Sequence, residues 1–409
     1  MNYSPISRLE VLWIGQYASE EIFAELVSKG WQSASAHVSQ RNIIDALDDL
    51  GLAFVTLNAY TLPADYAERV IARRTWRRIN GAENVSVGFP NIKYLAHLFR
   101  MKALMVEARQ WVKTSQCQKR IVIVYGIQSS LLAAALAIKR LHPNMHICLI
   151  APDLPQYMDL DMSPLKRALK YLDWRAIKQQ LSSVDSFIVY AEPIAGYLGL
   201  KKQKYMVMEG SLPAEEVPSI PVSPNRDSTV VMYSGKLDKR FGILELLRAI
   251  NLIDDQYEFW FSGSGNALDE IVGASKRDPR IKYLGFLPSR AALLQTQQRA
   301  SMLINMRLPE EPSSRYSFPS KLLEYMASGR PVLSPRLQGI PEEYYNYIVE
   351  MPSVKPLDIA TTILRTAALP ADELVRYGQQ ARDFILKNKT ATAQAKRIID
   401  FISAQAKGL

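Results

Sequence analysis

Short apolar runs alternate with longer amphipathic segments along the whole chain. The runs in the first half are rich in aliphatic residues, as is typical of parallel strands that are buried on both faces. They are LEVLWIG (9–15), LAFVTLN (52–58), RIVIVYG (120–126), MHICLIA (145–151) and SFIVYA (186–191). The segments between them have helical periodicity. In the segment 39–51 we expect Ser39 to cap a helix and Gly51 to end it.

A second series of apolar runs follows in the second half of the chain. It comprises STVVMYSG (228–235), EFWFSG (258–263), IKYLGF (281–286), SMLINM (301–306) and RPVLSP (330–335). Two series of strand–helix alternation predict an α/β fold with two doubly wound domains. Prolines without periodicity indicate a linker between the series. The expected boundaries are 1–211 for the first domain, 212–228 for the linker, 229–385 for the second domain and 386–409 for a final helix.

The chain carries a net charge of +10, which points to an anionic partner such as nucleic acid, anionic lipid or a phosphorylated small molecule. No helix-turn-helix spacing, zinc knuckle or stacking stripe is recognisable, so we expect no nucleic acid. Cys117 and Cys148 lie far apart without metal-ligand spacing, which favours a reduced, cytoplasmic setting. No apolar run is long enough to predict a membrane span.

The segment FPSKLLEYMASGRPVL (318–333) predicts a helix over about 319–328 with an anion site at its start. Pro319 suits the first turn because it has no N–H to leave unpaired. Lys321 adds a positive charge there, and Glu324 could accept hydrogen bonds from a ribose diol. The alternative is that Glu324 only complements the helix dipole while Lys321 is solvated.

The segment YSGKLDKRFG (233–242) places three cations in a short loop after a strand. Gly235 would let the backbone approach a ligand, and Lys236, Lys239 and Arg240 would neutralise a diphosphate. The alternative is a solvated loop. Gly263, in FSGSGN (261–266), follows the next strand, but this G-x-G is a weak signal by itself.

These motifs, in this order and with IKYLGFLPSRAALL (281–294), resemble the donor half of family 4 glycosyltransferases. CLIAPDLPQYM (148–158) and MVMEGS (206–211) resemble the branch that builds bacterial capsular polysaccharides and exopolysaccharides. The resemblance covers about 120–345. It implies the GT-B fold, with two facing Rossmann-like domains and a C-terminal helix that returns to the first. The first domain would bind the acceptor and the second the donor.

The resemblance implies retaining, metal-independent transfer of a hexose from a nucleotide-diphosphate sugar, with no further cofactor. Glu324 matches the second glutamate of the E-x7-E signature, which holds the ribose, whereas Tyr316 stands in place of the first. Lys236, with Lys239 or Arg240, matches the pair that neutralises the leaving diphosphate, and backbone N–H groups at Lys321 and Leu322 would assist. The remaining expected donor-site residues are Gly235, Gly263, Phe318 and Ser320.

On the acceptor side, Asp153 is the candidate for orienting the acceptor hydroxyl. It occupies the place where the family commonly has a histidine, although an Asp in a proline-flanked turn can also be purely structural. His37 could lie near the acceptor, whereas His142 and His146 are interpreted as structural. The D-x-D tripeptide at 159–161 is interpreted as a chance match.

The segment 163–181 has a basic face and an apolar, aromatic face, as interfacial helices do, and RRTWRR (73–78) adds a second basic patch. We therefore expect peripheral contact with the anionic inner face of the plasma membrane, where a polyprenyl-diphosphate-linked saccharide would be the acceptor. A helix buried on one face and solvated on the other is the alternative. Two other functions stay open: a sugar-nucleotide epimerase of the same fold, or a catalytically silent basic binding module.

Overall fold

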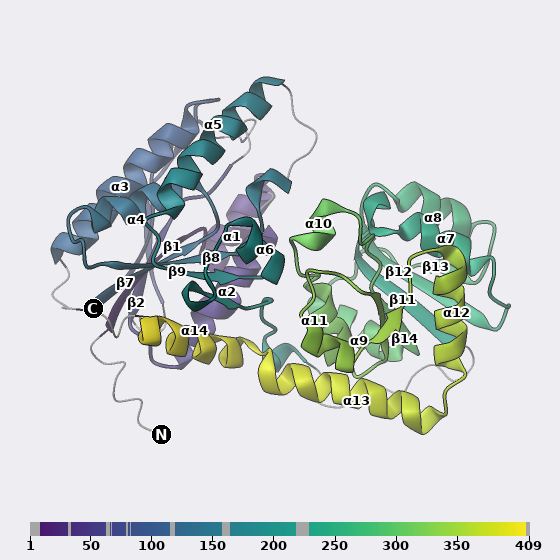
Figure 1. Ribbon diagram of the computed structural model, residues 1–409. Coiled ribbons are helices and arrows are strands. Elements are labelled where there is room, and N and C mark those ends of the chain that lie inside the picture. Colours follow the sequence, from purple (N-terminus) through teal and green to yellow (C-terminus); the bar gives the residue numbers. More distant parts are fainter. Residues whose placement is uncertain are drawn as a thin grey trace. The chain divides into compact units, whose positions relative to one another are not determined.

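The structure is a computed structural model that describes residues 9–31, 34–62, 66, 68–78, 81, 83–114, 119–157, 164–217 and 229–405 (Figure 1). The chain forms two compact units. The first unit comprises Met1–Tyr190, Ile194–Met208 and Gln394–Leu409, and the second comprises Ala191–Pro193 and Glu209–Ala393. Most of the linker expected at 212–228 lies outside the described residues.

The first unit contains an eight-stranded sheet of order β10-β9-β8-β7-β1-β2-β5-β4. The apolar runs predicted five of its strands, which are β1 (Leu9–Gly15), β2 (Phe54–Asn58), β7 (Lys119–Tyr125), β8 (His146–Ala151) and β9 (Ser186–Val189). The strands that were not predicted are β3 (Val70–Ile71), β4 (Arg74–Arg77), β5 (Glu83–Ser86), β6 (Phe89–Pro90) and β10 (Tyr205–Val207). β4 pairs antiparallel with β5, and β3 and β6 form a separate antiparallel pair.

Helices cover this sheet, and α3, α4 and α5 lie side by side on one face of it (Figure 1). The helices of the unit are α1 (Glu20–Ser28), α2 (Ala34–Asp49), α3 (Ala96–Thr114), α4 (Ser129–Lys139), α5 (Pro164–Leu181), α6 (Glu192–Tyr197) and α14 (Ala391–Gln405). The cap predicted at Ser39 is wrong, because α2 begins at Ala34 and Ser39 lies inside it. Gly51 follows the end of α2 with a φ of 77°, which confirms the predicted stop.

The second unit contains a six-stranded parallel sheet of order β13-β12-β11-β14-β15-β16. Its strands are β11 (Thr229–Lys236), β12 (Tyr257–Ser264), β13 (Ile281–Tyr283), β14 (Met302–Ile304), β15 (Val332–Pro335) and β16 (Val349–Met351). All but β16 were predicted. The helices are α7 (Ile243–Ile250), α8 (Leu268–Ser275), α9 (Arg290–Arg299), α10 (Pro312–Arg315), α11 (Lys321–Ala327), α12 (Pro356–Ala367) and α13 (Ala371–Asn388).

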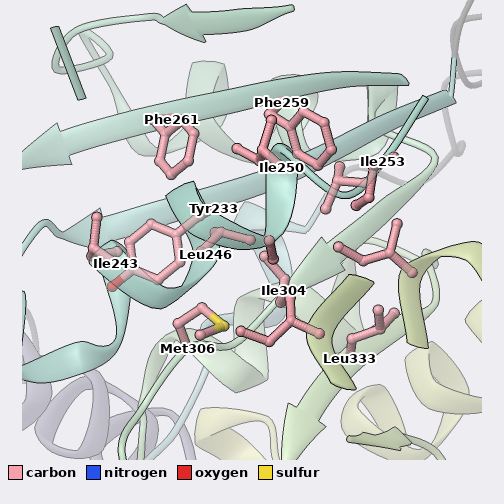
Figure 2. Packing of buried hydrophobic residues seen from close by; sticks show 14 of the residues in the cluster. Tyr233, Ile243, Leu246, Ile250, Ile253, Phe259, Phe261, Ile304, Met306 and Leu333 are labelled. Atoms are coloured by element: carbon pink, nitrogen blue, oxygen red, sulfur yellow. The ribbon is translucent and has the colours of Figure 1, made fainter. Parts of the chain in front are cut away.

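Alternate residues of the central strand β11 enter two different apolar cores, as a sheet covered on both faces requires. Val231 and Tyr233 pack with residues of α7 on one face, whereas Val230 and Met232 pack with residues of α11 on the other. Figure 2 shows the first of these cores, with Tyr233 near Phe261 of β12. This packing fixes the strand ends on which the candidate site is built.

The last helix, α14, belongs to the first unit from Gln394 onward, as expected for a returning C-terminal helix. The Arg397 guanidinium donates a hydrogen bond to the Val207 carbonyl at 2.8 Å, and the Gln405 amide donates to the Gln203 carbonyl at 2.9 Å. None of the helices in the described part of the chain is both long enough and apolar enough to traverse a lipid bilayer.

Candidate functional site

The carboxyl ends of β11 and β12 approach each other with no side chain between them. Gly235 and Gly263 are paired in register, with φ angles of 125° and 130°. A Cβ atom on Gly263 would lie 1.9 Å from the Gly235 carbonyl oxygen, so no larger residue fits there. The result is an edge of bare backbone that a ligand can approach closely.

A buried tyrosine of α11 holds the end of β11 in place. The Tyr325 hydroxyl accepts a hydrogen bond from the Ser234 N–H at 2.7 Å and donates one to the Ser234 carbonyl at 2.7 Å. The Gln297 amide donates to the Ser234 hydroxyl at 2.9 Å. These buried bonds fix the backbone just before Gly235, which favours a preformed site.

Lys321, the first residue of α11, is the most unusual group of the site. Its ammonium nitrogen is shielded from solvent and has no hydrogen-bond partner among the described residues. It lies 3.7 Å from the centroid of the Tyr233 ring. Burial, and next the charge of Arg307, holds the pKa of Lys321 well below its usual value. The alternative of a solvated Lys321 is therefore wrong, and an anion beside it would supply the missing counter-charge.

The three cations of the loop after β11 have different environments. The buried Asp238 carboxylate accepts bonds from the Arg240 guanidinium at 3.0 and 2.7 Å, and these bonds lower the pKa of Asp238 to about 2. Lys239 pairs with Glu270 of α8. The side chain of Lys236 is 62% exposed and lies 3.6 Å from the Asp238 carboxylate. Asp238 thus orients Arg240, while Lys236 stays open to solvent.

Glu324 lies one turn after Lys321 on α11 and is partly buried. Its carboxylate lies 3.2 Å from the Arg290 guanidinium, at the start of α9. Ser289 caps α9 by accepting a hydrogen bond from the Ala292 N–H at 3.1 Å. Arg290 thereby fixes the direction of the carboxylate that we expected to hold a ribose.

The other expected donor-site residues surround the start of α11 in different ways. Phe318 and Leu322 are buried in the apolar core, so a ligand could reach only their backbone. The Leu322 N–H already donates to the Pro319 carbonyl at 2.8 Å. Ser320 is exposed, and Tyr316 is half-buried at the end of α10.

Two residues near these strand ends were missed from the sequence. Arg307 follows β14, and its guanidinium stacks on the Phe241 ring with 4.8 Å to the ring centroid. Its charge acts on Lys321, as noted above. Phe286 follows β13 and is 83% exposed, next to Gly285, whose carbonyl accepts a hydrogen bond from the Gly263 N–H at 3.0 Å. The position of each after a strand was the available signal.

Asp153 lies in the first unit, after β8, near a group of hydroxyls. The Tyr190 hydroxyl lies 3.0 Å from that of Ser39 and 3.3 Å from that of Tyr125. Burial, and to a smaller extent the Asp153 carboxylate, raises the pKa of both tyrosines. This hydroxyl cluster stands at the carboxyl ends of β7 and β9, the edge where α/β sheets bind ligands.

Two histidines of the first unit, His37 and His146, are buried, whereas His142 is exposed. The His37 ring stacks on Phe23 with 4.2 Å between centroids, and burial lowers the pKa of His37 to about 4. The His146 ring, at the start of β8, lies 2.8 Å from the hydroxyl of Ser186, at the start of β9, in agreement with a structural role. The D-x-D tripeptide at 159–161 lies outside the described residues.

Several solved structures align with nearly the whole chain at low sequence identity. The lipopolysaccharide outer core galactosyltransferase WaaB aligns with a TM-score of 0.64 at 14% identity, over 97% of this chain and 99% of WaaB. Anabaena HepE in complex with UDP aligns with a TM-score of 0.66 at 10% identity, over 97% and 100%. Sucrose-phosphate synthase from Thermosynechococcus elongatus aligns with a TM-score of 0.63 at 16% identity, over 98% and 100%. The fold is therefore GT-B.

Residues 228–369 match the family model "Glycosyl transferases group 1", and this range covers most of the second unit. No curated protein matches the chain. The second unit thus contains a region that is similar to this glycosyltransferase family.

Proposed function

We propose that the chain is a retaining, metal-independent hexosyltransferase that uses a nucleotide-diphosphate sugar and a polyprenyl-diphosphate-linked saccharide in bacterial capsular or exopolysaccharide synthesis. The observation that carries the donor assignment is the Lys321 ammonium, shielded and without a hydrogen-bond partner among the described residues, beside the bare backbone at Gly235. A buried ammonium group of this kind binds most strongly to a compact anion with several negative charges, and a diphosphate is such an anion.

In this proposal the cations act on the leaving group. The bond between the anomeric carbon and the β-phosphate oxygen breaks, and its electron pair stays on that oxygen. Lys321, Lys236 and Arg240 stabilise the charge that develops there, and this interaction strengthens toward the transition state. Glu324, directed by Arg290, accepts hydrogen bonds from the ribose diol.

The acceptor hydroxyl becomes bonded to the anomeric carbon on the face that the diphosphate leaves, which retains the configuration. Its proton passes to the departing phosphate. In the first unit, Asp153 orients the acceptor hydroxyl, as a carboxylate beside the Tyr190 and Tyr125 hydroxyls can.

Exposed apolar residues on α5 support the proposed contact with an anionic membrane. Leu169, Tyr171 and Leu172 are 44%, 62% and 58% exposed, and Ile177 anchors the opposite face in the core. The basic patch at 73–78 does not contribute in the same way. Its arginines at 73, 74 and 78 form ion pairs with carboxylates of the same unit.

The test begins with thermal shifts for UDP-, GDP- and dTDP-sugars, because a ligand that binds the folded state raises its melting temperature. UDP-sugars come first, since UDP occupies the HepE structure. Glu324→Gln is expected to lose most of the shift, and the exposed Lys276→Gln is the matched control. Absence of a shift with every nucleotide sugar would overturn the donor assignment.

Transfer is then followed with the donor that binds, with and without a polyprenyl-diphosphate-linked saccharide. We expect a longer saccharide that forms only when this acceptor is present. Formation of an epimeric sugar or sugar nucleotide without acceptor would replace the proposal with an epimerase. Binding without any turnover would favour a silent binding module.

A further inference from the structure

A cavity of about 540 Å³ lies at the edge of the first unit that is opposite to Asp153. Its walls include Val184, which precedes β9, and Lys204, which precedes β10, so it is at the amino ends of these strands. Asp153 and Tyr190 follow β8 and β9 at the carboxyl ends of the same parallel sheet. The cavity is therefore separate from the hydroxyl cluster around Asp153.

The lining of this cavity combines aromatic and aliphatic walls with three lysines. Trp174 and Tyr197 have ring centroids 6.2 Å apart, and the Lys178 ammonium lies 5.8 Å from the centroid of the Trp174 ring. Lys201 and Lys204 line the same cavity. Phe187 with leucine and valine side chains completes the wall.

The three lysines are available to an anion. All are exposed, and none forms an ion pair with another residue of the described ranges. Exposed ammonium groups gathered around one apolar hollow repel each other, and an anionic group placed among them would relieve that repulsion. A purely apolar ligand would leave this charge unused.

The apolar wall continues out of the cavity onto the exposed side of α5. Tyr171, Trp174 and Lys178 are spaced by three and four residues, so they lie along one stripe of the helix. Tyr171 is 62% exposed, and Leu172 beside it is 58% exposed. The ligand that fits thus has an apolar part reaching beyond the cavity, which a free phosphate or a sugar phosphate lacks.

We propose that this cavity binds a single anionic lipid of the membrane, with its phosphate among Lys178, Lys201 and Lys204 and its proximal acyl chain against Trp174 and Tyr197. The inference rests on the membrane contact in the proposed function and specifies which lipid chemistry holds the first unit there. It does not depend on the donor chemistry of the second unit.

The probe is dihexanoylphosphatidylglycerol below its micelle concentration, compared with dihexanoylphosphatidylcholine and with glycerol 3-phosphate, by calorimetry on the full chain. The variant Lys178→Gln/Lys201→Gln/Lys204→Gln removes three charges from the cavity. The control Lys276→Gln/Lys355→Gln/Lys387→Gln removes three exposed charges from the second unit. We expect binding of the anionic lipid to weaken at least about tenfold in the first variant alone, because that variant lacks the three charges that attract the lipid phosphate.

Equal binding of the phosphatidylcholine would overturn the proposal, and so would an equal loss in both variants. Glycerol 3-phosphate binding as tightly as the lipid would show a site for a free anion instead. The nucleotide-sugar shift is recorded on the same samples. If the unmodified chain binds no lipid but keeps its thermal shift with the nucleotide sugar, only this inference is refuted. If it binds the lipid but shows no thermal shift with the nucleotide sugar, only the donor assignment is refuted.

Discussion

Lys321 combines two opposing demands on one side chain. An ammonium group shielded from water without a counter-ion destabilises the fold, yet it is the group that gains most when an anion arrives. The Tyr233 ring offers it a cation–π contact, at 3.7 Å from the centroid, but no hydrogen bond and no counter-charge. Such a compromise between stability and binding is common at functional sites.

We expect Lys321→Met to stabilise the protein at neutral pH by roughly 1–3 kcal/mol, because it removes the buried charge. The folded pKa of Lys321 lies below its unfolded value of about 10.5. The wild type therefore gains stability as pH rises through the window between these two values, and the variant lacks this gain. Urea unfolding at pH 7 and pH 10 measures both effects.

The same Lys321→Met variant should lose the thermal shift given by a nucleoside diphosphate. Lys276→Met, which changes an exposed lysine, is the control and should alter neither stability nor binding. A Lys321→Met variant that is less stable than the wild type at pH 7, or that binds the diphosphate normally, would contradict this description of the site.

Phe286 is a large aromatic residue held open to solvent beside the strand ends. Stacking of a base on such a ring contributes about 1–3 kcal/mol, so we expect Phe286→Ala to weaken nucleotide binding roughly tenfold. Folding stability should change little, because the side chain is 83% exposed. Leu357→Ala, at a site that is 66% exposed on α12, controls for loss of surface apolar area. Unchanged affinity in Phe286→Ala would place the base elsewhere.

At the scale of elements, the ends of β11 and β12 depend on glycine at Gly263. Gly263→Ala would combine a φ of 130° with a Cβ atom 1.9 Å from the Gly235 carbonyl. We expect a loss of roughly 2–4 kcal/mol in unfolding free energy together with weaker donor binding. Gly273→Ala in α8, where the nearest atom would be 3.6 Å away, should stabilise instead by about 0.5–1 kcal/mol. Similar results for both variants in denaturant unfolding would argue against the close approach.

The sequence predicted elements best where burial alone determines them. The continuous apolar runs of β1 and β7 need no partner to be recognised. β4 (RTWR) and β5 (ENVS) are short and polar, and they become strands by pairing, β4 with β5 and β5 with β2. The start of α2 was misplaced at Ser39 because a serine before an apolar pattern resembles a cap.

The sequence predicted the motifs of the candidate site but not the surroundings of each side chain in it. The positions of Lys321 and Glu324 follow from one helix, so the sequence revealed them. The shielding of Lys321 depends on Tyr233 from a distant strand, and the direction of Glu324 depends on Arg290 from another helix. Such contacts arise from the tertiary fold, and a local pattern cannot encode them.

At the scale of the whole molecule, the chain passes between its two units at several places, and two of these are joined by a buried ion pair. Glu209 follows the end of one segment of the first unit, and Lys389 precedes the return to it at Gln394. The Lys389 ammonium donates hydrogen bonds to both Glu209 oxygens at 3.1 Å and to Glu343 at 2.7 Å. Leu212 and Thr390 add a parallel backbone bridge. Within the second unit, the segment at Glu209 and the segment at Lys389, where the chain enters and leaves this unit, are thus held together.

Because Lys389 and Glu209 are only 4% and 3% exposed, Lys389→Met should leave the Glu209 carboxylate buried without its cation, at a cost of about 3–5 kcal/mol. Adding Glu209→Gln should recover part of this loss, since the stranded charge is then removed. Lys387→Met, which changes an exposed lysine in the last turn of α13, should have little effect. Denaturant unfolding gives the stabilities, and amide hydrogen exchange in β11 reports the second unit separately. No recovery in the double variant would mean that the loss comes from the contacts of the Lys389 ammonium with the Tyr344 and Phe384 rings, at 5.1 and 5.5 Å from their centroids, and not from the charge left on Glu209.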